Sequence, residues 1–181
     1  MNGFRICWMV GIFLVLVSGA HAGTTTYTCN NCPVTIIDLG TVDATLQVND
    51  RCDEIGDINV SINISHTFDS DLNVDLIGPT AASVRLWDAL GGSGDGFNVT
   101  IDDEAAANFT CAAGPCNGTF RPETFPTEAL SEFDGTDAVG IWTLRVADVV
   151  GADVGTINTW SIELDCAVVP VELMEFESDK P

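Results

Sequence analysis

Apolar and polar residues alternate along several stretches of this chain. Ile58, Val60, Ile62 and Ile64 occupy every second position, and polar residues such as Ser61 fill the positions between them. A β-strand turns successive side chains to opposite faces, so a repeat of two indicates a strand with one buried face. The same repeat recurs in three further stretches, 72–76, 142–147 and 160–165.

Gly, Pro, Asp and Asn separate these stretches, and shorter candidate strands lie at 34–39, 45–48 and 84–87. Many short strands punctuated in this way predict an all-β domain. One-sided alternation favours antiparallel strands, because strands of a buried parallel sheet are apolar on both faces. We therefore expect an antiparallel, jelly-roll-like β-sandwich. Only residues 102–108 have a helical composition, enough for about two turns.

The N-terminus has the three parts of an export signal. Arg5 supplies a positive charge, an apolar run covers 6–17, and Ala-His-Ala occupies 20–22. The apolar run is too short to span a bilayer, so we place cleavage after Ala22 and expect a secreted chain without a membrane span; an uncleaved N-terminal anchor is the alternative. We divide the chain into a signal peptide (1–22), a cysteine-containing segment (23–33), one β-domain (34–166) and a tail or start of a further module (167–181).

Acidic residues dominate the charge of the chain. There are 27 Asp and Glu against 6 Lys and Arg, which gives a net charge of −21. A surface of this sign repels phosphate backbones and excludes nucleic acid as a partner. The hydrophobic fraction of 46% is too high for a disordered chain. The excess acid either keeps the protein dissolved or supplies ligands for divalent cations, and both can hold together.

Six cysteines remain once the signal peptide is removed, and an even number in an exported chain predicts disulfides. Cys111 and Cys116 enclose a Gly-Pro turn that can bring them together. The other four allow three pairings, among which Cys52 with Cys166 would tie the approach of the first long strand to the end of the last. Cys29 and Cys32 lack the βαβ context of a redox motif. A zinc site formed by these four cysteines is the alternative.

Two long motifs in this chain resemble those of a known protein family. The first motif contains His66-Thr67, Asp71-Leu72, Val74, Leu76 and Pro79. The second contains Gly140, Trp142-Thr143-Leu144, Val146, Asp148, Gly155, Ile157, Trp160 and Ile162, and Phe133 and Gly135 precede it. In order and spacing these residues resemble the P domain (Homo B domain) that follows the catalytic domain of furin- and kexin-like subtilases, in its bacterial secreted form. The resemblance covers approximately residues 34–165.

The resemblance implies a β-sandwich that packs on a subtilisin-like catalytic domain and helps it to fold or stay stable. It assigns structural roles to six motif residues: His66, Asp71, Trp142, Asp148, Gly155 and Trp160. A subtilisin triad needs Asp, His and Ser from separate motifs, and no Gly-Thr-Ser nucleophile segment is present, so we expect no enzyme. We expect a stabilising or targeting module whose partner is a secreted protein, such as a subtilisin-like protease, or an extracellular polymer. The alternative is a calcium-dependent carbohydrate- or protein-binding adhesion module.

Calcium is the cofactor that the acidic loops suggest. It takes about six to eight oxygen ligands, and loop carboxylates suit it. The candidate ligands are Asp71, Asp95, Asp102, Asp103 and Asp148. Turns that are distant in sequence can meet at one end of a sandwich, which would bring Asp71 to Asp102 and Asp103; a solvated acidic rim is the alternative. Among the aromatic residues, Trp87 is the one candidate for a surface position.

Overall fold

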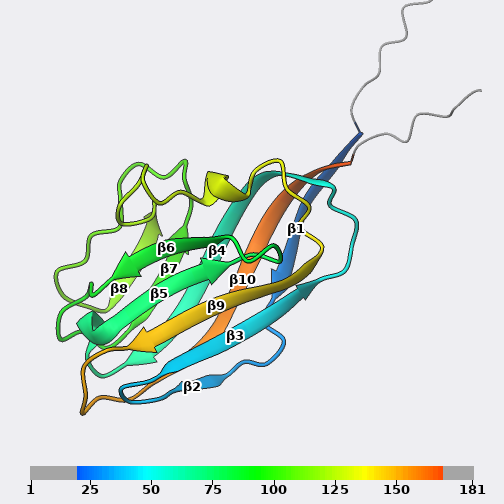
Figure 1. Cartoon of the computed structure of the whole chain (residues 1–181). Helices are drawn as coiled ribbons and strands as arrows, with labels where there is room; N and C mark the ends of the chain where they lie inside the picture. The colour runs from blue at the N-terminus through cyan, green and yellow to red at the C-terminus, as the bar shows by residue number, and fades with distance from the viewer. Residues whose placement is uncertain (1–19, 169–181) are drawn as a thin grey trace, which may run out of the picture.

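The computed structural model describes residues 20–168, which form two β-sheets packed face to face (Figure 1). The strands are β1 (Ala20–Thr28), β2 (Val34–Ile36), β3 (Thr41–Val48), β4 (Glu54–His66), β5 (Leu72–Ile77), β6 (Ser83–Asp88), β7 (Phe97–Ile101), β8 (Cys116–Phe120), β9 (Gly140–Asp148) and β10 (Gly155–Val168). Two short 3-10 helices, η1 (Asp69–Asp71) and η2 (Leu130–Phe133), accompany them. The predicted all-β sandwich is confirmed.

The larger sheet has the strand order β1-β10-β4-β7-β8, with β2 also paired to β10. Its longest pairing joins β4 to β10 in antiparallel register, with Trp160 opposite Ile62. Along β4 the residues from Ile58 to Ile64 alternate between buried and accessible positions, as the sequence repeat predicts. The buried set includes Val60, which is fully inaccessible. The alternation therefore fixes which face of this sheet packs on the other.

The smaller sheet has the order β3-β9-β5-β6 and is antiparallel throughout. Trp142 on β9 is buried in the core, and its indole Nε1 donates a hydrogen bond to the carbonyl of Ala138 at 2.9 Å. Trp160 on β10 is 1% exposed and belongs to the same core. Both tryptophans of the second sequence motif therefore stabilise the packing between the two sheets.

One strand pair departs from the antiparallel expectation. β7 and β8 run parallel, with Phe97 opposite Cys116 and Ile101 opposite Phe120. A parallel pair needs a crossover connection rather than a tight turn. The 102–115 segment supplies it without a helix: residues 103–107 form turns and bends, and Asn108 forms an isolated bridge with Arg121, so the predicted short helix is wrong. In this segment Oδ1 of Asp102 accepts a hydrogen bond from the amide of Glu104, and a local side-chain-to-backbone bond of this kind competes with helical ones.

The predicted surface position of Trp87 is also wrong. Its side chain is completely buried and packs against the rings of Phe97 and Phe109, with centroids 4.9 and 5.1 Å away. The register between β5 and β6 shifts at this point, because Val74 is opposite Trp87 while Asp75 is opposite Arg85. A bulge adds a residue to one strand and inverts the alternation beyond it. Trp87 therefore faces inward, where uninterrupted alternation would turn it outward.

Three disulfides join Cys29 to Cys32, Cys52 to Cys166 and Cys111 to Cys116. The pairing expected across the Gly-Pro turn is present, and so is the pairing between the approach to β4 and the end of β10. All four cysteines of the alternative zinc site are consumed in disulfides. The Cys29–Cys32 disulfide lies in the turn between β1 and β2, which pair with successive parts of the same edge of β10.

The proposed boundaries of the domain lie partly outside the described residues. The signal-peptide prediction falls mainly on 1–19 and the tail mainly on 169–181, which the structure does not describe. The proposed cleavage after Ala22 would remove the first three residues of β1 and leave Gly23–Thr28 paired with β10. Within residues 20–168, no helix is both long and apolar enough to span a bilayer.

Candidate functional site

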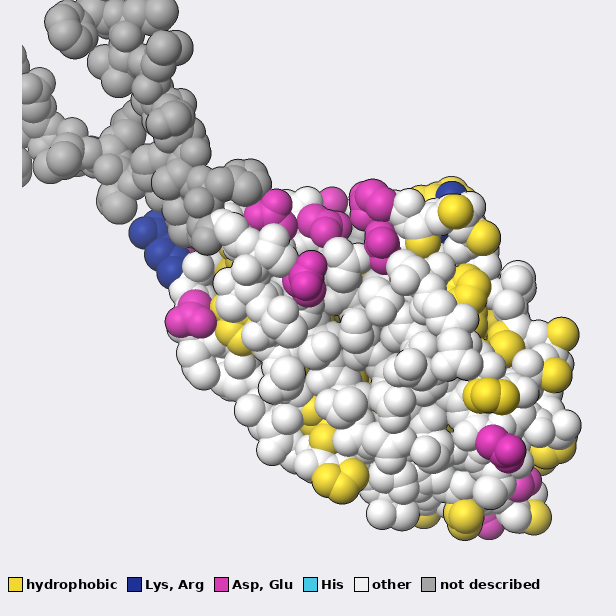
Figure 2. Space-filling model, turned by 180° about the vertical axis from the view of Figure 1, so that it is seen from behind, with side chains coloured by type: hydrophobic (Ala, Val, Ile, Leu, Met, Phe, Trp, Pro, Cys, Tyr) yellow, Lys and Arg dark blue, Asp and Glu magenta, His cyan; other side chains and the backbone are white. Residues whose placement is uncertain are grey.

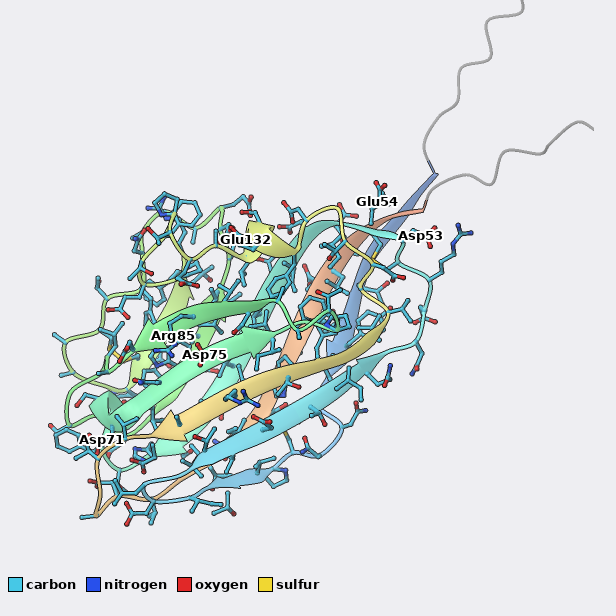
Figure 3. All side chains as sticks on the ribbon, viewed as in Figure 1. Asp53, Glu54, Asp71, Asp75, Arg85 and Glu132 are labelled. Carbon is cyan, nitrogen blue, oxygen red and sulfur yellow. A yellow bond between two sulfur atoms is a disulfide. The ribbon has the colours of Figure 1, made fainter. Side chains whose placement is uncertain are left out.

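Buried polar side chains gather at one end of the sandwich. In the part of the chain that the structure describes, the buried polar or charged residues are His66, Asp69, Asp71 and Asp148. His66 ends β4, the two aspartates near it belong to η1, and Asp148 ends β9. Figure 3 labels Asp71 at this end and Glu132 of η2 at the opposite end. We call this group of four the buried polar end.

His66 and Asp148 form the centre of the buried polar end. The imidazole Nε2 lies 3.3 Å from Oδ2 of Asp148, and both side chains have zero exposure. The other ring nitrogen, Nδ1, lies 2.8 Å from the carbonyl oxygen of Phe68. The amide of Val150 donates to the second oxygen of Asp148 at 3.2 Å. Buried polar groups are stable only when paired, so this pair fixes the ends of β4 and β9 relative to each other.

Gly155 completes the setting of the histidine. A methyl group at Gly155 would overlap Cδ2 of His66 and lie 2.6 Å from the carbonyl of Ser65. Gly155 is opposite His66 in the pairing of β10 with β4, which explains the close approach. The second sequence motif therefore contains a glycine here because the imidazole ring of the first motif occupies the side-chain space.

Asp71 is a buried carboxylate that lies near two other negative charges. Burial raises its pKa above the ordinary value of 3.8, and the negative charges of Asp153 and Asp148 raise it further, while His66 acts in the opposite direction. Its backbone carbonyl accepts a hydrogen bond from the amide of Val149 at 2.9 Å. The charges of Asp71, Asp148 and Asp153 therefore interact at this end of the fold, together with His66.

Asp69 is a buried carboxylate that is not among the five predicted calcium ligands. Its Oδ2 accepts a hydrogen bond from the amide of Gly96 at 2.9 Å, while its Oδ1 has no hydrogen-bond partner. Burial is the main cause of its raised pKa. Side chains at Gly91, Gly94 or Gly114 would overlap this carboxylate. The glycines of two loops are the sequence signal that could have indicated a buried group here.

The five predicted calcium ligands do not meet at one place. Asp71 and Asp148 belong to the buried polar end, and the charge of Asp95 raises the pKa of neighbouring Asp69. Asp102 and Asp103 follow β7 beyond Ile101, which pairs with Val60, whereas the opposite end of β7 pairs with Ile64 close to His66. The idea that Asp71 joins Asp102 and Asp103 is therefore wrong, because β7 separates them along its length.

Asp103 has a local structural task at the opposite end. Its two carboxylate oxygens accept hydrogen bonds from the amides of Leu130 and Ser131 at 3.0 and 2.9 Å, which anchors the start of η2. Near it, burial and the charges of other acids raise the pKa of Asp57, while Glu104 shows a raised pKa from burial and its bond to Asp102. In residues 20–168, no three His, Cys, Asp or Glu side chains are arranged to hold a metal ion.

The surface beside the buried polar end is an open depression of about 460 Å³. It is lined by Thr35, Ser65, His66, Thr67, Asp95, Val154, Gly155 and Thr156. The His66 side chain has no exposed area, so the depression does not present the imidazole to a substrate. Ser65 is adjacent in sequence but lies on the outer face of β4, where its hydroxyl contacts Asn158 at 2.8 Å. The arrangement is suited to holding loops together.

These features define a class: a disulfide-linked β-sandwich in which residues of the two sequence motifs form a buried His66–Asp148 pair. Residues 55–164 match the family described as the proprotein convertase P-domain. The match spans more than half of the chain, and the chain therefore belongs to this family.

The relatives are proteases much longer than this chain. It is 33% identical over 103 residues to leupeptin-inactivating enzyme 1 of Streptomyces exfoliatus, covering 57% of this chain and 17% of that protein. It is 32% identical over 113 residues to a calcium-dependent protease of Trichormus variabilis, covering 61% of this chain and 14% of that protein. The chain thus spans less than a fifth of the length of either relative.

A solved structure shares the fold. A crystal structure of the Aeromonas sobria serine protease in complex with a chaperone aligns with a TM-score of 0.54 at 14% sequence identity. The alignment covers 83% of this chain and 27% of the solved one. At this identity the likeness supports the sandwich fold alone.

Proposed function

We propose that this chain is a non-catalytic P domain that acts outside the cell, where it stabilises or positions a subtilisin-like serine protease. The observation that carries the proposal is the family match over residues 55–164. P domains are associated with proteases of this kind, and the two relatives named above are proteases of which the matched stretch is a small part. A module that occupies so little of a protease leaves the chemistry to the remainder.

The surroundings of the His66 ring are unfavourable for a catalytic role. Both of its ring nitrogens contact protein groups, Phe68 and Asp148, and the ring has no exposed area. A general base must reach the hydroxyl that it activates. The neighbouring residue Ser65 is on the opposite face of β4, so the two side chains point away from each other. A Ser-His pair from adjacent strand positions is therefore unsuited to nucleophilic catalysis.

Calcium is a second part of the proposal. The Trichormus variabilis relative is named a calcium-dependent protease. In this chain, the charges of Asp148 and Asp153 raise the pKa of Asp71, and a cation bound beside them would remove that repulsion. Because no three acidic, histidine or cysteine side chains in residues 20–168 are arranged to hold a metal, backbone carbonyls or a loop movement would have to complete the coordination.

Export of the chain from the cell is a third part of the proposal. Three disulfides require an oxidising compartment to form and persist. The N-terminal sequence has the charge, apolar run and cleavage site of a secretory signal, which supports secretion before the disulfides close.

The proposal is tested with a protease that lacks its own matching region. The calcium-dependent protease of Trichormus variabilis is produced without the stretch that matches this chain, and is refolded alone or with the oxidised chain added. Recovered proteolytic activity should rise when the chain is present. The reduced chain is the matched control and should give less recovery. Equal recovery with and without the oxidised chain would contradict the proposal.

A further inference from the structure

The outer face of the larger sheet carries an ordered set of uncharged polar side chains. Across β1, β10, β4, β7 and β8, one register line contains a hydroxyl side chain on every strand. The residues are Thr28, Ser161, Ser61, Thr100 and Thr119. Adjacent strands are about 4.8 Å apart, so these hydroxyls repeat at that spacing across the sheet. We call this line the hydroxyl row.

A second line runs beside the first, two residues along each strand. It contains Thr159, Asn63, Asn98 and Asn117. Each line contains a hydrogen bond between neighbouring strands. The hydroxyls of Ser61 and Thr100 are 3.1 Å apart, and the amide of Asn63 donates to Asn98 at 3.2 Å. We call this line the amide row. The cross-strand bonds hold side chains in fixed positions, which reduces the entropy lost when a ligand binds.

The two rows are free of charge in a protein whose net charge is −21. Acidic residues on this face stand beyond the rows: Glu163 next to the hydroxyl row, then Asp57 opposite Asp165. Figure 2 views the molecule from behind: the centre of this face is mostly white, and magenta side chains gather at the upper margin, with a smaller group at the lower right.

The outer face of the smaller sheet, by contrast, carries charged side chains. This face carries two ion pairs. Arg85 pairs with Asp75 (Figure 3), and Arg145 pairs with Asp43, with 2.8 Å between Nε and Oδ1. The outer faces of the two sheets therefore differ in chemistry although both are accessible to water. Two adjacent rows composed of Ser, Thr and Asn alone are a specific arrangement in so acidic a chain.

A shallow trough of about 220 Å³ lies along the rows. Its lining includes Thr28, Ser161 and Ser61 of the hydroxyl row, and Thr159 and Asn63 of the amide row. Each hydroxyl and each amide both donates and accepts hydrogen bonds. A ligand in this trough would therefore be recognised by polar groups of mixed donor and acceptor character, repeated at the spacing of the strands.

From these observations we infer that the two rows bind a neutral polysaccharide lying across the strands. Sugar hydroxyls donate and accept as the row side chains do, and a polymer repeats as the rows repeat. A protein partner would need an apolar centre to its interface, and the rows offer none. A nucleic acid would need positive charge, and the rows have none. This surface is distinct from the buried polar end and does not depend on the proposed protease partner.

The inference is tested by sedimentation with three washed, insoluble neutral polymers: cellulose, chitin and starch granules. The oxidised chain is made in a bacterial host, so that the Asn-x-Ser/Thr sequences at Asn63, Asn98 and Asn117 stay unmodified. We expect binding to at least one polymer. Binding should persist in about 1 M sodium chloride, because salt screens charges and the rows contain none.

Two substitutions of equal charge locate the surface. Ser61→Glu places a carboxylate in the middle of the hydroxyl row, and Thr143→Glu places one on the central strand β9 of the other sheet. Ser61→Glu should weaken binding by roughly tenfold or more, because the added charge loses water against a neutral ligand. Thr143→Glu should change it less than about twofold. Thermal melting checks that both variants fold.

Thr100→Val provides a second variant that keeps the shape of the side chain and removes the hydroxyl. It should weaken binding by a smaller factor, because one hydrogen bond of the row is lost. The inference is overturned if none of the three polymers binds the unaltered chain, if binding disappears in high salt, or if Ser61→Glu and Thr143→Glu reduce binding equally.

Discussion

The imidazole ring of His66 lies directly over the α-carbon of Gly155, and no side chain other than hydrogen fits between them. The two residues are opposite each other in the pairing of β4 with β10. They come from separate sequence motifs, 89 residues apart, and the contact explains why each motif needs the other. It also closes the buried polar end from the side of β10.

Replacing Gly155 by alanine should therefore destabilise the domain. The new methyl group would overlap Cδ2 of His66 and crowd the carbonyl of Ser65, and overpacking of this kind costs about 1–3 kcal/mol. Gly56→Ala is the matched control on β4, because a methyl there meets only the carbonyl of Asp165 at an ordinary 3.4 Å. Urea unfolding should show a lower midpoint for Gly155→Ala and little change for Gly56→Ala. Equal effects would contradict the steric account.

Removing the imidazole of His66 should lower the free energy of unfolding more than neutralising its partner, Asp148. His66→Ala leaves the Asp148 carboxylate buried without the imidazole, and breaking such a pair costs about 3–5 kcal/mol. Asp148→Asn keeps the shape and a polar group facing Nε2, and its loss of stability should be smaller. Chemical unfolding of the two variants measures both. If His66→Ala unfolded at the same denaturant concentration as the unaltered chain, the pair would have no structural role.

The raised pKa of Asp71 has a consequence for pH dependence. An acid whose pKa is higher in the folded state than in the unfolded one binds a proton more tightly when folded, so its contribution to stability is fully present below the unfolded pKa. That contribution disappears as the pH rises through the folded pKa, which burial, Asp153 and Asp148 raise above 3.8 against the influence of His66. Lowering the pH from neutrality toward 4 should therefore favour the folded state at this site.

Asp71→Asn isolates the effect. In chelator at pH 7 the variant should melt at a higher temperature than the unaltered chain, because it removes the repelled charge. The difference should shrink as the pH falls toward 4, where Asp71 takes up its proton. Melting followed by circular dichroism across this range provides the measurement. A difference that grew on acidification would have the wrong sign for a raised pKa.

Calcium should act on the same charges. If it binds the native state selectively, millimolar calcium raises the melting temperature by mass action. Asp71→Asn should reduce that rise, because the carboxylate repulsion that a cation would relieve is then partly absent. Asp103→Asn is the comparison at the opposite end, where the carboxylate binds the amides of Leu130 and Ser131. No calcium-dependent shift in the unaltered chain would remove calcium from the proposal.

The disulfides should contribute unequally. Cys52 and Cys166 are separated by 114 residues, and closing so long a loop stabilises the folded state by about 4–5 kcal/mol in the chain-entropy account. Cys111 and Cys116 are five residues apart, which gives about 2 kcal/mol. Paired alanine substitutions at each disulfide, compared by denaturant unfolding, should show the larger loss for the long loop. The opposite order would contradict the entropic account.

The fold could be predicted where side chains alternate without interruption. Ile58 to Ile64 on β4 give the buried face directly, and so does Trp142 on β9. The rule failed at Trp87, because a bulge in β6 changes the register and leaves no mark in the sequence repeat. It failed again for β7 and β8, since the direction of pairing depends on the crossover between them and not on their own residues.

The buried polar end could be predicted only in part, because some of its contacts come from segments that are distant in sequence. His66, Asp148 and Gly155 were reached through the two motifs, whose spacing reflects the pairing of β4 with β10. Asp69 was not, because its burial depends on loops that fold over it from two distant segments. Carboxylates such as Asp103 resemble ligands in sequence, and only the structure assigns it to backbone amides.

The most direct measurement is the melting temperature of a chimera. In the calcium-dependent protease of Trichormus variabilis, the stretch that matches this chain is replaced by residues 23–168, and the chimera is compared with the protease lacking that stretch. The account predicts that the chimera unfolds at a higher temperature, and that adding His66→Ala to it removes most of the gain. A chimera that melts no higher than the shortened protease would contradict the claim that this domain stabilises a protease.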